Sequence, residues 1–377
     1  LALPPYQQAL ADAVKHANPD TVVVLLSNYP YAITRLQEEM PGILWSASGS
    51  QELGTGIANV LCGKISPAGR LNMTWYLSDK DLPDINDYDI IKGKRTYQYF
   101  DREVLYPFGY GLSYGEFSYG KLSLEKKEKQ IIARLTITNT GAYVSDEVVQ
   151  LYVHKETSRV TQPISRLKAF ARIKNISPGE TRKVELAVNC GELEIYDVIS
   201  ENMLLESGEY IFLAGASSRD IRQRATIYLE GKKMGLRSPW KVTAADRYDD
   251  YKNCFIHKGT EGFTCTIPGK AGDSPDAAET AGGKKEAGIC IYHDFLFERV
   301  PEELVMCMHA LEEGRIQITV YSRESQETDS LTIQIRKGKG FEDHRISIPA
   351  GFHVPGDPCS LKIETEGKIR LCRFFFR

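Results

Sequence analysis

The acidic side chains of this chain could act as nucleophiles or as general acids and bases wherever two carboxyl groups are held close together. Sequence neighbours that might form such pairs occur at Glu38-Glu39, at Glu312-Glu313 and in a loop with Asp84, Asp87 and Asp89. Adjacent residues on a helix point apart, and the loop lacks the glycine and the closing glutamate of a calcium-binding loop. We therefore expect neither a catalytic pair nor a metal site among them.

The cysteines are the other reactive side chains, and there are eight, at positions 62, 190, 254, 265, 290, 307, 359 and 372. They form no Cys-x-x-Cys pair and no Cys/His spacing typical of zinc, so no metal site is predicted. Buried free thiols in a reducing compartment are the expected state, although a disulfide remains open beyond residue 250. No signal peptide is visible, and we expect a cytoplasmic location, but the chain begins at Leu1 and its natural N-terminus is not seen.

Candidate binding residues follow two short apolar runs near the N-terminus. Asn28 and Tyr29 come after the run 21–26, and Trp45 ends the run 43–45. In open α/β sheets, ligands gather outside the carboxyl ends of the strands, so these three side chains could contact a substrate. The alternative for Asn28 is an ordinary turn residue, and the alternative for Trp45 is packing in the core or at a domain interface.

The elements that would position these residues alternate between helix and strand. Helices are predicted over 7–17, 31–40 and 54–62, and strands covered on both faces over 21–26 and 43–45. This alternation predicts a mostly parallel sheet with helical cover. Open parallel sheets usually need about five strands, so the layer is incomplete as written. Either it is the tail of a larger domain or another chain completes it.

The remainder of the chain is rich in predicted strands separated by Gly and Pro turns. Runs between 131 and 229 predict one β-sandwich, and runs between 263 and 376 predict a second, with a loop over 273–283. The expected fold class is mixed: an incomplete α/β layer over 1–87, an aromatic connector over 88–117, and β-sandwich domains over 118–231 and 232–377. The final strand, with three consecutive Phe residues, should lie inside a sheet.

The segment 95–114 reads Arg-Thr-Tyr-Gln-Tyr-Phe-Asp-Arg-Glu-Val-Leu-Tyr-Pro-Phe-Gly-Tyr-Gly-Leu-Ser-Tyr. It predicts an ordered connector, held by buried rings and bent by Pro and Gly. It closely resembles the connector after the second catalytic domain of glycoside hydrolase family 3. The segments 138–141, 147–153 and 215–220 resemble the fibronectin type III-like module of that family, and 232–377 is similar to jelly-roll carbohydrate-binding modules.

The resemblance implies a retaining β-glycosidase that removes non-reducing-end β-linked xylose or glucose without a cofactor. Such enzymes use an Asp nucleophile from an N-terminal barrel domain and a Glu acid/base from the second domain. The family's Glu lies shortly before a stretch that corresponds here to residues 1–10, so we expect no catalytic residue in this chain. The expected partners are the missing N-terminal barrel part and a carbohydrate; a homo-oligomer is open.

The resemblance also suggests binding residues. Gln51-Glu52 matches part of a Pro-Gly-Gln-Glu-Gly-Gly loop, although Gly49-Ser50 and Leu53 depart from it, and Glu52 could instead cap the following helix. The segments 69–76 and 95–97 look more like the β-xylosidase branch than the β-glucosidase branch. In the last domain, rings that could stack on sugars or pack in the core are Trp240, Tyr248, Tyr251 and Tyr292.

Two other functions remain open. The chain could be a carbohydrate-binding or scaffold protein that reuses glycosidase modules, in which case further strands of this chain should close the first sheet; or its sandwiches could bind protein. The formal net charge of -3 argues against a surface that binds nucleic acid as a whole, and no apolar run approaches the ~18 residues of a membrane span.

Overall fold

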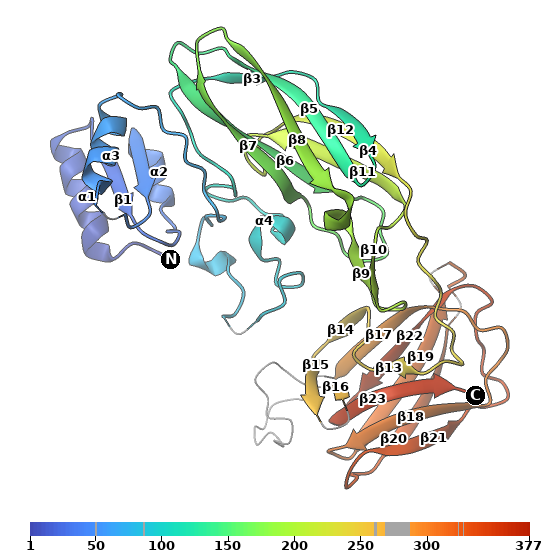
Figure 1. Cartoon of the computed structure of the whole chain (residues 1–377). Helices are drawn as coiled ribbons and strands as arrows, with labels where there is room; N and C mark the ends of the chain where they lie inside the picture. The colour runs from blue at the N-terminus through green and yellow to red at the C-terminus, as the bar shows by residue number, and fades with distance from the viewer. Residues whose placement is uncertain (50, 86, 260–261, 268–286, 323, 327) are drawn as a thin grey trace. The chain divides into compact units, whose positions relative to one another are not determined.

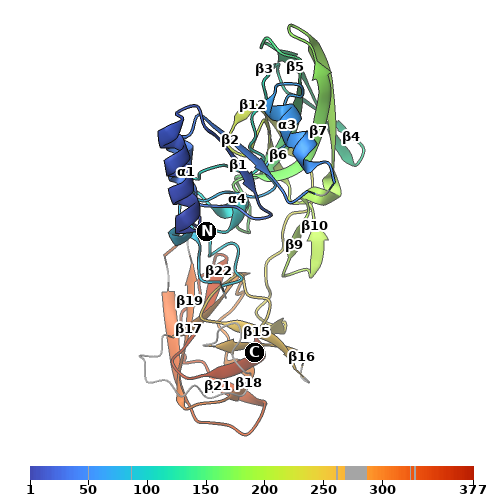
Figure 2. The same cartoon turned by 90° about the vertical axis from the view of Figure 1, so that its left-hand side faces the viewer.

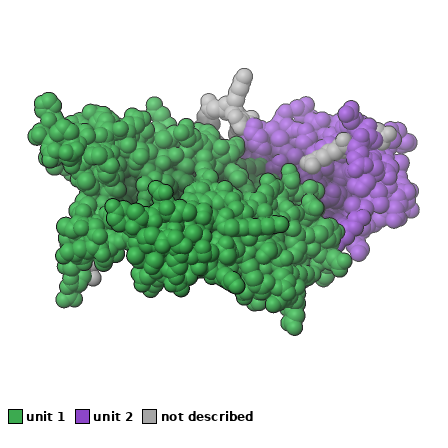
Figure 3. Space-filling model, turned by 90° about the horizontal axis from the view of Figure 1, so that it is seen from above, with its two compact units in different colours: residues 1–194, 205–232 green, residues 195–204, 233–377 purple. Residues whose placement is uncertain are grey.

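The computed structural model describes residues 1–49, 51–85, 87–259, 262–267, 287–322, 324–326 and 328–377 (Figure 1). The chain forms two compact units, coloured separately in Figure 3. The first unit holds Leu1–Glu194 and Leu205–Lys232, and the second holds Ile195–Leu204 and Lys233–Arg377. No described helix combines the length and the apolarity that a membrane crossing requires.

The first unit begins with the predicted alternation of helices and strands. Its elements are α1 (Pro5–Ala17), β1 (Val22–Leu26), α2 (Thr34–Glu39), β2 (Gly42–Ser46) and α3 (Leu53–Leu61). The strands β1 and β2 are parallel neighbours, with Val22 opposite Gly42 and Leu26 opposite Ser46 (Figure 2). Pro5 opens α1, where its missing N–H and its fixed φ suit the first helical turn.

The core of this α/β layer is small. Its fully buried members are Leu25, Ile33, Leu36, Met40 and Trp75. The prediction that the first strand is covered on both faces is wrong for this chain, because Val22, Val24 and Leu26 are 47%, 36% and 52% exposed. Only one face of β1 packs against the core, and no described strand besides β2 pairs with it.

The connector is ordered, as predicted. A short 3-10 turn η1 (Asp79–Asp81) precedes it, and it includes the one-turn helix α4 (Thr96–Tyr99). The Tyr97 ring stacks on Phe108 with 4.2 Å between centroids, and its hydroxyl accepts a hydrogen bond from the Leu167 backbone N–H at 3.1 Å. Gly109 has φ +81°, and a Cβ there would lie 2.0 Å from Oε1 of Gln150. The connector is therefore fastened to the following sandwich at a position that only glycine fits.

The fibronectin-like sandwich of the first unit consists of two antiparallel sheets. One sheet has the order β12-β11-β6-β7; in the other, β5 pairs with β3, β4 and β8. The strand bounds are β3 (Phe117–Tyr119), β4 (Ser123–Lys127), β5 (Gln130–Asn139), β6 (Ser145–His154), β7 (Arg166–Ile176), β8 (Thr181–Asn189), β11 (Gly208–Gly215) and β12 (Ile221–Leu229), with a 3-10 turn η2 (Cys190–Leu193) after β8. Alternating residues of both sheets meet in one core that includes Ile131, Val149 and Phe212.

The second unit is a larger β-sandwich, so the predicted fold class is confirmed. One sheet has the order β15-β16-β23-β18-β21, with β13 also on β23, and the other has the order β14-β17-β22-β19-β20. The strands are β13 (Thr243–Ala244), β14 (Asp250–Lys252), β15 (Phe255–Gly259), β16 (Gly262–Ile267), β17 (Gly288–Phe295), β18 (Glu303–Ala310), β19 (Gly314–Ser322), β20 (Thr328–Ile335), β21 (Glu342–Ser347), β22 (Cys359–Thr365) and β23 (Ile369–Phe376). The Phe-rich β23 lies inside its sheet, as predicted. The predicted loop 273–283 lies outside the described residues.

A short hairpin of β9 (Ile195–Asp197) and β10 (Asn202–Leu204) also belongs to the second unit, although its sequence lies between two strands of the first sandwich. Arg247 of the second unit binds it, with Nη1 donating to the Tyr196 hydroxyl at 2.8 Å and Nη2 donating to Glu201 Oε2 at 3.1 Å. The sequence pattern did not indicate this membership, because neither strand contains enough residues to show an alternation.

Candidate functional site

The carboxyl ends of β1 and β2 meet at one edge, because the strands are parallel and in register up to Leu26 and Ser46. The loops that follow are joined to each other. The Ser48 backbone N–H donates to Oδ1 of Asn28 at 2.9 Å, and the Ser27 N–H donates to the Ser46 carbonyl at 3.1 Å. The side-chain oxygen of Asn28 thus holds the loop that follows β2.

The Trp45 side chain contacts both this edge and the core of the α/β layer. Its Nε1 donates to Oγ of Ser27 at 3.1 Å, and that hydroxyl in turn donates to the Tyr29 carbonyl at 2.8 Å. The Trp45 ring meets the buried Trp75 edge-on, with 5.9 Å between centroids. Trp45 is half-buried, so packing accounts for much of the ring while part of it remains at the surface.

Tyr29 is the most accessible ring at this edge, with 56% of its surface exposed. It lies beside Tyr31, with 5.1 Å between centroids and 3.2 Å between the two hydroxyl oxygens. The hydrogen bond with Tyr29 raises the pKa of Tyr31. The edge therefore presents two neighbouring phenol groups, which can donate and accept hydrogen bonds and can stack on an apolar sugar face.

Glu52 is exposed and occupies the residue immediately before α3, but its side chain makes no hydrogen bond to that helix. The alternative prediction that its side chain caps the helix is therefore wrong. Asn28, Tyr29 and Trp45 lie at the same edge of the sheet, at or just after the carboxyl ends of β1 and β2. Among the described residues, no hydrogen bond ties Glu52 to that edge.

The acidic loop before the connector has a structural role. Asp87 Oδ1 accepts the Asp89 N–H at 3.0 Å, and Asp89 Oδ1 accepts the Ile91 and Lys92 N–H groups at 2.9 Å. Nη2 of Arg95 donates to the carbonyls of Asp84 and Asp87 at 2.7 and 2.6 Å. The carboxylates and the guanidinium group thus both hydrogen-bond to the loop backbone and hold its shape.

The rings of the second unit differ in accessibility. Tyr292 is fully buried and its hydroxyl donates to the Ala245 carbonyl at 2.8 Å. The sugar-stacking role suggested for this ring is therefore wrong, and the alternative, packing in the core, is confirmed. Trp240, Tyr248 and Tyr251 are half-buried against the core. The Arg299 guanidinium lies 4.8 Å from the Trp240 ring centroid, which leaves at most the other ring face for a ligand.

A buried ion pair that the sequence analysis missed joins the end of the α/β layer to the first sandwich. Nη2 of Arg70 lies 3.2 Å from Oε2 of Glu147, and the Tyr119 hydroxyl donates to Oε1 of Glu147 at 2.8 Å. Burial raises the pKa of Glu147, and the nearby Arg70 charge opposes that rise. Arg70 and Glu147 line a cavity of about 510 Å³ together with residues 110–113, 216–217 and 219–220. The sequence alone does not indicate this ion pair, because its two residues lie 77 positions apart in the chain.

The first unit joins a parallel α/β layer to a β-sandwich through an aromatic connector. Residues 1–114 match the glycosyl hydrolase family 3 C-terminal domain, and residues 147–218 match the fibronectin type III-like domain. Residues 1–114 therefore form a glycosyl hydrolase family 3 C-terminal domain and residues 147–218 belong to a fibronectin type III-like domain, which confirms the family resemblance for these two segments.

Curated relatives include a xylan 1,4-beta-xylosidase of Xylanibacter ruminicola, 35% identical over 58% of this chain and 25% of the relative. A beta-glucosidase of Kluyveromyces marxianus is 34% identical over 58% of this chain and 27% of the relative. The chain thus spans about a quarter of the length of these relatives.

Solved structures of beta-glucosidases are similar to this chain as well. The beta-glucosidase of Kluyveromyces marxianus in complex with glucose has a TM-score of 0.56 at 30% identity, covering 61% of this chain and 29% of that one. A beta-glucosidase of Bifidobacterium adolescentis has a TM-score of 0.58 at 29% identity, covering 63% and 37%.

Proposed function

We propose that this chain is the C-terminal part of a retaining β-glycosidase that removes xylose or glucose from the non-reducing ends of β-linked oligosaccharides or glycosides. The names of the relatives, beta-xylosidase and beta-glucosidase, support the substrate class. Retention requires two carboxyl groups about 5–5.5 Å apart. The proposal assigns both to the rest of the protein, the nucleophile to an N-terminal barrel, and gives this chain no catalytic carboxylate.

The two-stranded sheet of the α/β layer is the observation that carries the proposal. Parallel sheets are normally covered on both faces and seldom have so few strands. Here the apolar residues of β1 and α1 remain exposed, including Leu10, Val14, Val22 and Leu26. A scaffold protein complete in itself would need further strands of its own in this sheet, and the described residues place none there. This observation favours an enzyme part that other secondary structure completes.

Within this proposal, the edge formed by Asn28, Tyr29 and Trp45 faces the substrate side of the layer. The exposed Tyr29 ring would contact the sugar, while Asn28 and Trp45 hold the loop that presents it. Glu52 is a weaker candidate, because no described contact ties it to that edge. We propose as well that the second unit offers Trp240, Tyr248 and Tyr251 to carbohydrate.

A complementation assay tests the proposal. The chain is assayed alone, and again after co-expression with the protein segment encoded upstream in its source gene, on chromogenic β-xyloside and β-glucoside. We expect no turnover by the chain alone and turnover by the pair. Turnover by the chain alone would contradict the assignment of the catalytic carboxyls to the other part, and inactivity of a stable complex on both sugars would contradict the substrate class.

A further inference from the structure

Three cysteines from separate strands meet in the core of the second unit. Cys254 immediately precedes β15, Cys265 lies in β16 and Cys290 lies in β17. The strands β15 and β16 belong to one sheet and β17 to the other, so the cluster lies between the two sheets of the sandwich. Cys265 and Cys290 are fully buried and Cys254 is 8% exposed.

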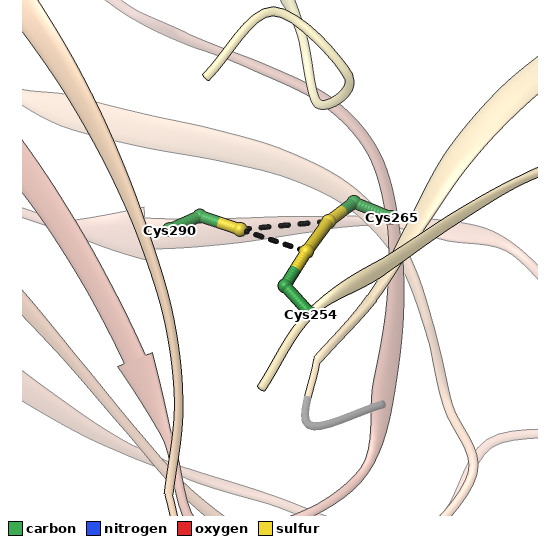
Figure 4. Close-up of side chains that lie close together, drawn as sticks. All are labelled: Cys254, Cys265 and Cys290. Carbon is green, nitrogen blue, oxygen red and sulfur yellow. Dashed lines mark hydrogen bonds between the residues drawn. A yellow bond between two sulfur atoms is a disulfide. The ribbon is translucent and has the colours of Figure 1, made fainter. Parts of the chain in front are cut away.

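The three sulfur atoms are in mutual contact (Figure 4). Cys254 and Cys265 form a disulfide, which corrects the prediction of free thiols for this pair and leaves the predicted cytoplasmic location untested. Sγ of Cys290 lies 3.3 Å from Sγ of Cys254 and 3.4 Å from Sγ of Cys265. The Cα atoms of the bonded pair are 6.6 Å apart, near the long end of the range for disulfides. The same spacing suits two side chains that ligate one ion.

We propose that the reduced forms of Cys254, Cys265 and Cys290 bind a single soft metal cation through their three sulfur atoms. Ligand sulfurs about 2.3 Å from a tetrahedral ion lie roughly 3.8 Å from one another. The distances from Cys290 are within about half an ångström of this value, so the backbone already gathers the ligands. Thiolates select Cu(I) and Zn²⁺ over hard cations such as Mg²⁺ and Ca²⁺.

The chemistry of the cluster makes metal binding and the disulfide mutually exclusive. A reductant such as a phosphine delivers two electrons to the Cys254–Cys265 bond, and the two sulfurs take up two protons. The ion then displaces protons from the thiols, since only the deprotonated sulfur is a good ligand. The positive charge of the ion offsets the cost of holding thiolates in an apolar core.

Cys359 provides a matched control. It is equally buried in the same core, but its thiol donates to the Phe295 carbonyl at 3.4 Å and it is not a member of the cluster. Burial raises the pKa of Cys359 to about 12. Removing this sulfur therefore changes the number of buried cysteines without changing the proposed ligand set.

The test is a Cd²⁺ titration of the whole chain, reduced with a phosphine under argon and followed by thiolate-to-metal charge-transfer absorbance. We expect one Cd²⁺ per reduced chain. In Cys290→Ala the affinity for Cd²⁺ should fall by more than about 100-fold. Loss of a group that only hydrogen-bonds to a metal ligand already lowers metal affinity about 10–100-fold, and Cys290 would be a ligand itself. Cys359→Ala should bind like the wild type, and an oxidised sample with the Cys254–Cys265 bond confirmed by mass spectrometry should not bind.

Three results would overturn the proposal: no stoichiometric binding by the reduced wild type, equal binding by Cys290→Ala, or equal binding by the oxidised chain. Near-ultraviolet circular dichroism of each variant without metal shows whether it has folded. The wild-type titration decides the question on its own if a variant does not fold. The outcome does not depend on glycosidase activity, so it is independent of the proposed function.

Discussion

The strands β1 and β6 have similar apolar sequences but very different surroundings. β1 reads Val-Val-Val-Leu-Leu and pairs only with β2, and several of its side chains are exposed. β6 contains Val-Val-Gln-Leu-Tyr-Val, pairs with β7 and β11, and is buried along nearly its whole length. The comparison shows that an apolar run predicts a strand well, whereas its burial depends on neighbours that the run itself does not specify.

Introducing a charge at equivalent positions of the two strands should give the largest contrast. Val149→Asp places a carboxylate in the closed core of the sandwich and should cost more than about 4 kcal/mol or prevent folding. Val24→Asp, at a position that is 36% exposed, should change the unfolding free energy of the chain by less than about 0.5 kcal/mol. Urea denaturation measures both.

The same Val24→Asp variant should abolish the recovery of activity with the upstream segment, because the aspartate would then be buried at the new interface. Tyr143→Asp, at a position that is 65% exposed on the first sandwich, is the control and should leave the recovery intact. If Val24→Asp still complements fully, β1 does not contact the proposed N-terminal part.

Breaking the buried ion pair tests whether the layer depends on its attachment to the sandwich. Arg70→Ala leaves the Glu147 carboxylate buried without its partner and should cost about 3–5 kcal/mol, whereas the double variant Arg70→Met/Glu147→Met should cost much less. Arg134→Met removes the exposed pairs with Glu125 and Glu185 and should leave the urea midpoint nearly unchanged. A double variant as unstable as Arg70→Ala would show that packing, rather than an unpaired charge, sets the cost.

A side chain at Gly109 should weaken the fastening of the connector. Gly109→Ala forces an L-residue to φ +81° and places its Cβ against Gln150, which should cost at least roughly 1–3 kcal/mol. Gly69→Ala is the control in the neighbouring segment, because a Cβ there meets no atom within 4 Å. Thermal unfolding of the three proteins gives the comparison; equal midpoints would mean that the connector shifts freely.

The contributions of the buried Glu147 and the exposed Glu125 to the unfolding free energy should change with pH in opposite directions. We expect this to be the smallest of the predicted effects. Burial raises the pKa of Glu147, so its contribution to stability is fully present below the unfolded-state pKa and is lost as the pH rises through the folded value. The hydrogen bond from Arg134 lowers the pKa of Glu125, so its contribution is present above the unfolded-state pKa and is lost as the pH falls.

Urea midpoints of the wild type, Glu147→Gln and Glu125→Gln between about pH 3 and pH 7 check this prediction. The advantage of the wild type over Glu147→Gln should shrink as the pH rises, and its advantage over Glu125→Gln should grow. Parallel curves for the two variants would contradict the difference in burial.

Strands with clear alternation or strong β-branched content were predictable from the sequence, and those of both sandwich cores appear where expected. β18, which reads Glu-Leu-Val-Met-Cys-Met-His-Ala, and the polar β21 were missed, because neither shows a two-residue period. They pair with each other, and burial of β18 comes from its position between β21 and β23. Such strands are defined by their neighbours rather than by their own pattern.

The candidate site was predictable only in part. The predicted strand ends correctly placed Asn28, Tyr29 and Trp45 at one edge of the sheet, because two parallel strands in register end at the same edge. Tyr292 was misplaced because a Tyr in an alternating strand can face either the core or the solvent. The three-cysteine cluster was invisible to spacing rules, because its members come from two sheets and the fold alone brings them together.

The β9–β10 hairpin gives the chain an interleaved layout, in which a segment from the middle of one unit serves the other. A single cut after Lys232 would leave Arg247 without the Tyr196 and Glu201 side chains that it binds. A single recombination event that transferred only the segment after Lys232 would therefore separate the last sandwich from part of its own unit. Its donor and recipient would have to exchange the hairpin as well, which ties the inheritance of the two units together.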